Sequence, residues 1–537
     1  MGVPALSEAF RIVTFGLVKP QIQEERDKPS KRELLIVGIT SLAFFTLAVR
    51  AAISRSLYFD EIASFTVATR PSLPEFFRAL PYDGNPPIFF LLARVCLSLP
   101  LPKELALRLP SILGWLLAGL LSYAFVRRNT SGLFATAAMS LYFGGTLVGT
   151  AALEGRPYAL LIFFTASAMC AWQSATVGRH RYLAHLTLAL ATTGAILTHQ
   201  YGVIYVAVPV FTGEIIRSWR ARKTHFSVIT ATCTGWFALI FTVPAALKAQ
   251  APLLSSIKLC PGFHDRPRLE NFAAYSQTMP VFAPFALISC LLVVVIFFRK
   301  ARPSSETFPS HAPRPEEVGA TISLALLIPI MLFVTKIGTG YFVERYAVGA
   351  GLGMALCIPL LLSFWRHSAF IHFLCQGIIV YSLTMGCLAF LIARPHQSAA
   401  LEGLANDPLF LTNLHQENIV IGDPLTFSPT WWYSSSSARE RIHYLTDLHA
   451  AALRTDNPTA EFSLYLEQPY GAPTIDSYKD FLDSHGEFLL YLANDRLPSW
   501  IKERLLREGW TLSLIGSEGD RELYRVERSR PDIRVTK

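Results

Sequence analysis

Long apolar stretches alternate with short polar connections from residue 34 to residue 392. A helix needs about 20 predominantly apolar residues to cross the hydrocarbon core of a bilayer. The pattern therefore predicts eleven membrane-spanning helices, at residues 34–53, 108–126, 132–152, 157–176, 183–199, 201–217, 226–247, 280–298, 318–336, 346–364 and 370–392. A further apolar stretch, 86–100, is shorter, opens with two prolines and contains Arg94, which favours a helix at the membrane interface.

The charged residues between these stretches predict their orientation. Lys and Arg are retained on the cytoplasmic side of a membrane. If the N-terminus is inside, basic residues such as Arg127 and Arg128 occupy the inner connections, and Asp60, Glu154 and Glu344 occupy the outer ones. Counting 86–100 as a full span would reverse every later connection. The eleven-span arrangement, with the C-terminal region outside, is therefore preferred.

The pattern changes at about residue 394, after which no stretch of membrane-spanning length follows. ENIVIGDP (417–424) and GEFLLYLAND (486–495) each predict a buried strand, and LPSWIKERLLREG predicts an amphipathic helix that ends at Gly509. Residues 510–528 alternate in the way that is typical of a β-hairpin. The C-terminal region is therefore predicted to be a small α/β domain.

Composition supports the membrane assignment. Hydrophobic residues make up 52% of the 537 residues and charged residues only 16%, whereas roughly a quarter of an ordinary soluble chain is charged. We expect an α-helical polytopic membrane protein with a small C-terminal α/β extracytoplasmic domain. Its expected parts are a cytoplasmic segment (1–33), a transmembrane domain (34–393) with outer loops at 54–107 and 248–279, and the α/β domain (394–537).

The net charge of +9 does not indicate a nucleic-acid partner. The basic residues form short clusters between apolar stretches, where they fit membrane-flanking charge. The chain has no P-loop or GxGxxG segment, so no nucleotide cofactor is expected. It also lacks a CxxC pair or a Cys/His spacing typical of a metal site.

The first outer loop carries an acidic pair, Asp60 and Glu61, in the sequence SLYFDEIASF. A carboxylate that is partly shielded from water has a raised pKa, which suits a general base. An acidic pair at a helix start, favoured by the helix dipole, is the alternative. Further along, Asn85 precedes two prolines in a predicted turn, and Arg108 could hold an anionic head group or extend to the interface.

Three other outer connections carry polar clusters. The connection after the third span carries Glu154, Arg156 and Tyr158. Glu154 and Asp60 could act as a base and a metal ligand, or as a base and a group that positions the hydroxyl; alternatively, Glu154 could form a surface pair with Arg156. THQY, which contains His199 and Tyr201, joins the fifth and sixth spans. Arg345 and Tyr346 join the ninth and tenth spans, where an arginine could bind phosphate or anchor the span end.

These elements, in this order, resemble the GT-C superfamily of polyprenyl-phosphate-dependent glycosyltransferases. The resemblance covers residues 34–392 and rests on the acidic pair after the first span, the PP-containing juxtamembrane helix, RLP at the second span, ExRxY at 154–158, TH-Y at 198–201 and the late R-Y. The most similar branch is that of the protein O-mannosyltransferases and aminoarabinose transferases, the bacterial "family 39-like" proteins.

The resemblance implies roles for particular residues. Asp60 corresponds to the catalytic base with Glu61 beside it, and Glu154 to the second acidic position. Arg345 and Tyr346, with Arg108, correspond to contacts of the donor phosphate. Other candidates for the cavity are Asn85, Arg156, Tyr158, His199 and Tyr201. Many relatives have His or Lys directly before the two prolines, where this chain has Asn85, so a cationic side chain is missing at this position. A divalent metal at Asp60 and Glu154 is left open.

The implied reaction moves a sugar from a polyprenyl-phosphate donor to an acceptor hydroxyl on a lipid, glycan or protein, with inversion, at the outer face of the inner (plasma) membrane. Two alternatives are a lipid or glycan transporter or flippase, and a non-catalytic membrane scaffold for an envelope partner. A transporter should carry charges in mid-span and paired broken helices, whereas the polar groups here gather at one membrane face. Trp431 and Trp432 could stack a sugar, although an ordinary core pair is favoured.

Overall fold

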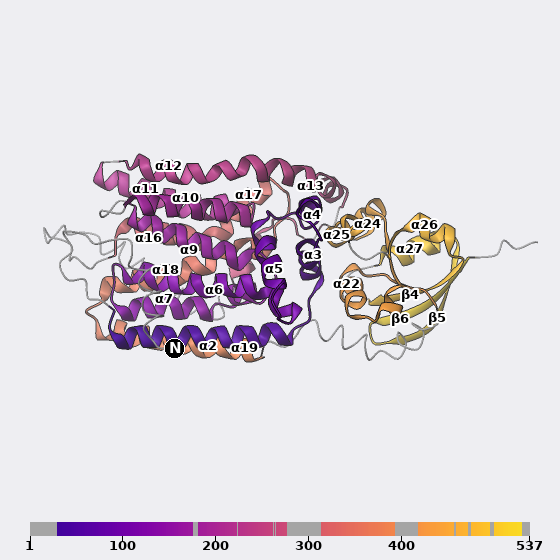
Figure 1. Ribbon diagram of the computed structural model, residues 1–537, viewed down its shortest axis with the longest axis horizontal. Coiled ribbons are helices and arrows are strands. Elements are labelled where there is room, and N and C mark those ends of the chain that lie inside the picture. Colours follow the sequence, from indigo (N-terminus) through magenta and orange to yellow (C-terminus); the bar gives the residue numbers. More distant parts are fainter. Residues whose placement is uncertain are drawn as a thin grey trace, which may run out of the picture.

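The protein consists of a bundle of long helices with a small sheet domain at one end, and the short helices α3 (Phe59–Ala68) and α4 (Leu73–Asp83) lie between them (Figure 1). The predicted fold class, a helical membrane protein with a C-terminal α/β domain, is confirmed. The computed structural model describes residues 29–175, 181–222, 224–260, 263, 265–275, 313–392, 417–455, 458–470, 474–493 and 499–528.

The bundle helices follow the predicted apolar stretches. They are α2 (Lys31–Ser54), α6 (Lys103–Arg127), α7 (Gly132–Gly144), α8 (Thr146–Ala152), α9 (Tyr158–Ser174), α10 (Arg181–Thr198), α11 (Gly202–Ala221), α12 (Phe226–Gly235), α13 (Leu239–Leu259), α16 (Pro315–Ala325), α17 (Leu327–Ile337), α18 (Gly349–Leu362) and α19 (Ala369–Ile392). The short 3-10 helices are η1 (Trp236–Ala238), η2 (Leu269–Ala273), η3 (Glu344–Ala347) and η4 (Ser363–Trp365).

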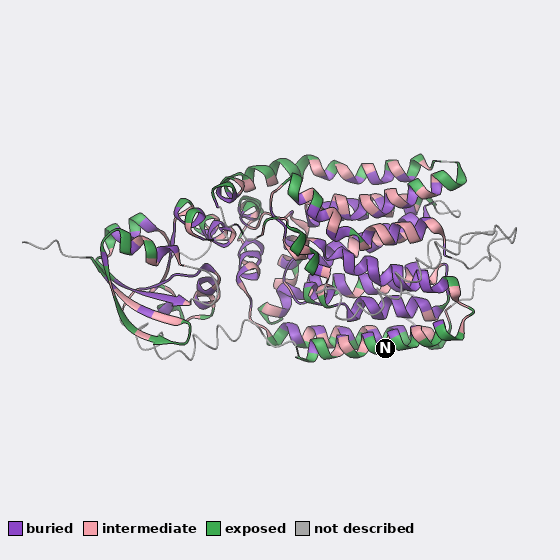
Figure 2. Ribbon diagram, turned by 180° about the vertical axis from the view of Figure 1, so that it is seen from behind, coloured by how far each residue is buried: buried purple, intermediate pink, exposed green. Residues whose placement is uncertain are grey.

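Among the described residues, five helices are long and apolar enough to cross a membrane, or up to seven if each bent pair forms one span. The chain is therefore a multi-pass membrane protein. The predicted span 280–298 lies outside the described residues, so the number eleven stays a prediction. Exposed residues lie along the outward faces of α2, α12 and α19, and many of them are large and apolar (Figure 2).

Two predicted spans are bent, which the apolar pattern did not indicate. α7 and α8 meet at 65°, and α16 and α17 meet at 54°. At the first bend a Cβ on Gly144 would lie 2.5 Å from the carbonyl oxygen of Ser382 in α19, so only glycine allows this close approach. In addition, α13 continues to Leu259, which makes the start of the predicted outer loop 248–279 helical.

Three short helices fill the predicted first outer loop: α3, α4 and α5 (Ile88–Leu97). α5 is the predicted interface helix, and its ten residues are too few to span a bilayer. Arg94 of α5 donates hydrogen bonds to the carbonyl oxygens of Ala68 and Arg70, at the C-terminal end of α3. The arginine that interrupts the apolar stretch therefore caps the neighbouring helix.

The C-terminal domain is a six-stranded sheet in the order β3-β2-β1-β4-β6-β5. β3, β2, β1 and β4 are parallel, and β6 and β5 form an antiparallel edge. The strands are β1 (Ile419–Ile421), β2 (Ile442–Thr446), β3 (Ile475–Ser477), β4 (Glu487–Ala493), β5 (Trp510–Glu518) and β6 (Arg521–Arg528). The two predicted strands and the predicted hairpin are confirmed as β1, β4 and β5–β6.

Helices cover both faces of this sheet, which gives the domain two apolar cores. One face packs against α22 (Pro424–Tyr433) and α25 (Thr459–Glu467). The other packs against α24 (Leu448–Arg454), α26 (Tyr478–Ser484) and the predicted amphipathic helix α27 (Trp500–Arg507). The remaining helix, α23 (Ser436–Arg439), is a single turn.

A buried carboxyl group makes the stability of this domain depend on pH. Burial raises the pKa of Glu461 to about 7, although Tyr444, the Asp447 amide and Trp500 donate hydrogen bonds to it. An unfolded chain has a Glu pKa of about 4.3, so stability falls as pH rises from about 4.3 through about 7, by a few kcal/mol in all. We expect Glu461→Gln to flatten this fall in thermal unfolding of the full chain.

The control for this prediction is Glu503→Gln on the exposed surface of α27, which should leave the pH dependence unchanged. Burial also raises the pKa of Glu467 to about 7, so the Glu461→Gln variant should keep part of the fall. An unaltered pH dependence in Glu461→Gln would contradict the assignment.

Candidate active site

The acidic pair at the start of α3 points in two directions. The Nη1 atom of Arg345, in η3, donates a hydrogen bond of 2.5 Å to Oδ2 of Asp60, and both side chains remain partly exposed. The Nε atom of Arg345 is buried and has no hydrogen-bond partner among the described residues. The guanidinium also lies over the ring of Tyr158, 5.7 Å from its centroid. Arg345 therefore holds Asp60 and keeps an unused donor.

Glu61 turns instead into the bundle, where Arg108 of α6 binds it with two hydrogen bonds of 2.7 and 2.6 Å. Neither side chain is exposed. Arg108 also donates to three backbone carbonyl oxygens, which lie on Ala52, Arg55 and Ser56. These contacts occupy the five donors of a guanidinium.

This geometry corrects two sequence-based expectations. Arg108 was expected to contact the donor phosphate, but it has no donor left to offer a ligand. Glu61 was expected beside the catalytic base, but its carboxylate is sealed in the ion pair and also accepts a hydrogen bond of 2.6 Å from the Gly155 amide. Both residues hold α3 and the segment after α8 in place.

A second buried arginine ties α3 to α4. Arg156 forms an ion pair with Asp83 and donates hydrogen bonds to Ser64 Oγ at 2.9 Å and to the Asp60 carbonyl oxygen at 3.2 Å. Asn85 donates a hydrogen bond of 2.6 Å to the other oxygen of Asp83. Asn85 and Arg156 thus meet through Asp83, which sequence reasoning had not singled out as a site residue.

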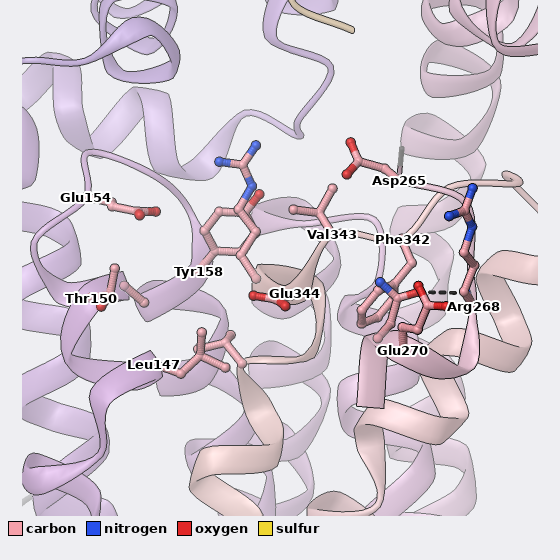
Figure 3. A pocket seen from close by; sticks show the side chains of 14 residues that line it. Leu147, Thr150, Glu154, Tyr158, Asp265, Arg268, Glu270, Phe342, Val343 and Glu344 are labelled. Carbon is pink, nitrogen blue, oxygen red and sulfur yellow. Dashed lines mark hydrogen bonds between the residues drawn. The ribbon is translucent and has the colours of Figure 1, made fainter. Parts of the chain in front are cut away.

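Arg345 and Glu154 line a cavity of about 540 Å³. Figure 3 shows Glu154, from the segment after α8, and Glu344, from η3, extending into the same space. The lining residues are Leu147, Thr150, Ala151, Glu154, Tyr158, Asp265, Arg268, Glu270, Asn271, Phe342, Val343, Glu344, Arg345 and Val348. Part of the predicted outer loop 248–279 therefore forms one wall.

Aromatic side chains from three connections pack beside Arg345. The His199 ring stacks on Tyr201 at 5.3 Å between centroids and lies 5.7 Å from Tyr346 and 5.5 Å from Tyr158. The hydroxyl of Tyr205 in α11 donates a hydrogen bond of 2.8 Å to the Tyr346 carbonyl oxygen. Four residues that were expected near one cavity thus form one cluster, although only Tyr158 lines the cavity itself.

The two carboxyl groups near the cavity differ electrostatically. Burial by itself raises the pKa of Asp60, but the guanidinium groups of Arg345 and Arg156 outweigh burial and hold that pKa below its usual value. Burial raises the pKa of Glu154, against the attraction of Arg345, and the charges of Glu61 and Asp60 add to the rise. Asp60 is therefore the anion at neutral pH, and Glu154 is the more basic group.

The residues do not fit a resident divalent metal. Asp60 Oδ2 is engaged by Arg345, and no group of three His, Cys, Asp or Glu side chains in the described part of the chain could hold a metal ion. We therefore derive no step through a metal at Asp60 and Glu154.

No family model matches the chain, and no curated protein matches it. Among solved structures, ArnT from Cupriavidus metallidurans in the apo state is similar, with a TM-score of 0.58 and 13% identity. The same protein bound to undecaprenyl phosphate gives a TM-score of 0.54 and 13% identity. Each match covers 92% of this chain and 97% of ArnT. At this identity the likeness concerns the fold, and the chain shares the fold of ArnT over nearly the whole length of both proteins.

Proposed function

We propose that the protein is a membrane glycosyltransferase that moves a sugar from a polyprenyl-phosphate donor to an acceptor hydroxyl. The proposal places it in the inner (plasma) membrane, with the N-terminus in the cytoplasm and the cavity and C-terminal domain outside. The acceptor is a lipid, a glycan or a protein. The fold shared with ArnT, of which one structure holds undecaprenyl phosphate, supports a lipid-phosphate donor.

The observation that carries the proposal is the state of Arg345. A buried guanidinium Nε without a partner costs free energy unless a ligand completes it. Arg345 lines the cavity, and a planar guanidinium matches the oxygens of a phosphate. The donor phosphate would therefore bind at Arg345, beside the rings of Tyr158 and Tyr346.

In the proposed mechanism Asp60 removes the proton from the acceptor hydroxyl. The oxygen of that hydroxyl attacks the anomeric carbon of the sugar at the same time. The bond between that carbon and the phosphate oxygen breaks, and the lipid phosphate leaves with its charge stabilised by Arg345. A single displacement inverts the anomeric configuration. Because the bound phosphate competes for Arg345, donor binding would loosen the hold on Asp60 and strengthen it as a base.

The test is the lipid that accompanies the purified protein. We expect mass spectrometry of wild-type protein in mild detergent to detect a sugar-loaded polyprenyl phosphate. Arg345→Ala should lose it, and its affinity for added undecaprenyl phosphate should fall about 10- to 100-fold, because a charge-assisted hydrogen bond contributes about 1.5–3 kcal/mol.

Arg366→Ala is the matched control, since this half-buried arginine follows η4 at the other end of α18. It should retain the lipid. If wild-type protein carries no such lipid and added undecaprenyl phosphate does not raise its thermal stability, the transporter and scaffold alternatives become preferable.

A further inference from the structure

The apolar core of the C-terminal domain extends onto a residue of the membrane domain. The side chain of Phe59, the first residue of α3, is 7% exposed and belongs to the same core as Ile421, Phe427, Tyr444 and Tyr491. Strand and helix residues of the domain thus surround a ring that lies directly before Asp60 in the sequence.

Further contacts from α22 fix the same segment. The Tyr433 hydroxyl accepts a hydrogen bond of 2.8 Å from the Leu57 amide and donates one of 3.0 Å to Glu104. The Trp432 ring meets Phe65 of α3 edge to face, with 4.8 Å between centroids. Trp432 therefore packs against the membrane domain, whereas Trp431 packs against the core of the C-terminal domain.

α3 is also held by three arginines of the membrane domain, of which Arg108 and Arg156 are buried. Arg108 binds Glu61, Arg156 binds the Asp60 carbonyl oxygen, and Arg94 binds the carbonyl oxygens at the end of the helix. α3 is thus clamped between two domains. The arginine contacts hold α3 against the bundle, and the apolar packing around Phe59 holds the first turn of α3 against the C-terminal domain.

We propose that Phe59 is a positioning residue through which the C-terminal domain places the Asp60 carboxylate beside Arg345. This inference rests on the proposed role of Asp60 as the general base. Under this proposal the C-terminal domain contributes to catalysis by positioning the Asp60 carboxylate. A misplacement of about 1 Å in a reacting group can lower a rate by about 100-fold, so the anchoring of a neighbouring residue affects catalysis.

The experiment compares Phe59→Ala with Phe488→Ala in full-length protein in lipid nanodiscs. Phe488 is also buried, but it belongs to the core on the other face of the sheet, away from α3. With the donor lipid identified in the preceding experiment, we expect Phe59→Ala to lower kcat at least tenfold and leave the donor KM within about twofold. Phe59→Leu, which keeps an apolar side chain, should recover most of kcat. At temperatures below its unfolding temperature, Phe488→Ala should have a kcat within about twofold of the wild-type value.

Hydrogen–deuterium exchange provides a readout that does not depend on activity. Phe59→Ala should speed exchange in α3, and Phe488→Ala should speed it only in the C-terminal domain. Equal kcat and equal α3 exchange in the two alanine variants would overturn the positioning role. Faster α3 exchange in Phe59→Ala together with a wild-type protein that transfers no sugar would instead contradict the proposed function and leave the anchoring intact.

Discussion

Replacing Asp60 with Asn is expected to lower kcat for glycosyl transfer by about 10²- to 10⁴-fold, the usual contribution of a positioned general base. The amide is nearly isosteric, so the fold should persist, but it cannot accept the proton of the acceptor hydroxyl. In the wild-type protein Asp60 Oδ2 accepts a hydrogen bond from Arg345 Nη1, so the substitution would remove the ionic partner of Arg345. Affinity for undecaprenyl phosphate should therefore be equal to or higher than in wild type, as measured by thermal shift.

A lower kcat together with an unchanged or higher affinity for undecaprenyl phosphate distinguishes loss of a base from general damage to the site. Because Arg345 and Arg156 hold the pKa of Asp60 below its usual value, the base stays ionised at neutral and mildly acidic pH, and kcat/KM should show no loss from this group in that range. Glu154→Gln is the comparison, since Glu154 lines the cavity and burial raises its pKa. If Asp60→Asn retains kcat and Glu154→Gln loses it, the base is Glu154.

The bundle and the sheet domain were predictable because their signals are local. Apolar length identifies a span, a short continuous apolar run indicates a buried strand such as β4, and alternation indicates a hairpin such as β5–β6, all without knowledge of their neighbours. The bend between α7 and α8 was not predictable, since it depends on the approach of Gly144 to the backbone of Ser382, far along the chain. Helix boundaries that depend on packing between distant segments leave little trace in a local pattern.

The site was predictable as a set of residues but not as a set of contacts. Consecutive residues of a helix point about 100° apart, so Asp60 and Glu61 must face different surroundings. The sequence does not state which of them meets Arg108 and which meets Arg345. Asp83 was missed as a partner of Arg156 because the two residues lie in different connections between the predicted spans, 73 residues apart in the sequence. A rule that every buried arginine requires a carboxylate would have indicated an acidic partner for Arg156.

The buried pair of Glu61 and Arg108 leads to the largest expected effect on stability. Arg108→Leu removes one partner and leaves a carboxylate in the bundle with only backbone amides, Gly155 and Tyr58, to bind it. It also leaves three carbonyl oxygens without their donor. Breaking a buried pair in this way costs about 3–5 kcal/mol. We expect a marked fall in the thermal unfolding temperature in detergent, with loss of activity through displacement of α3.

The double variant Glu61→Leu/Arg108→Leu separates the charge from the packing. Because well-packed apolar side chains can replace a buried ion pair at little cost, the double variant should recover part of the stability lost in Arg108→Leu. Arg220→Leu is the control, since Arg220 pairs with Glu316 at a partly exposed position, where a pair contributes about 1 kcal/mol or less. If Arg108→Leu and Arg220→Leu are equally stable, the five hydrogen bonds of Arg108 do not stabilise the fold as inferred. A role of Arg108 in ligand binding would then have to be reconsidered.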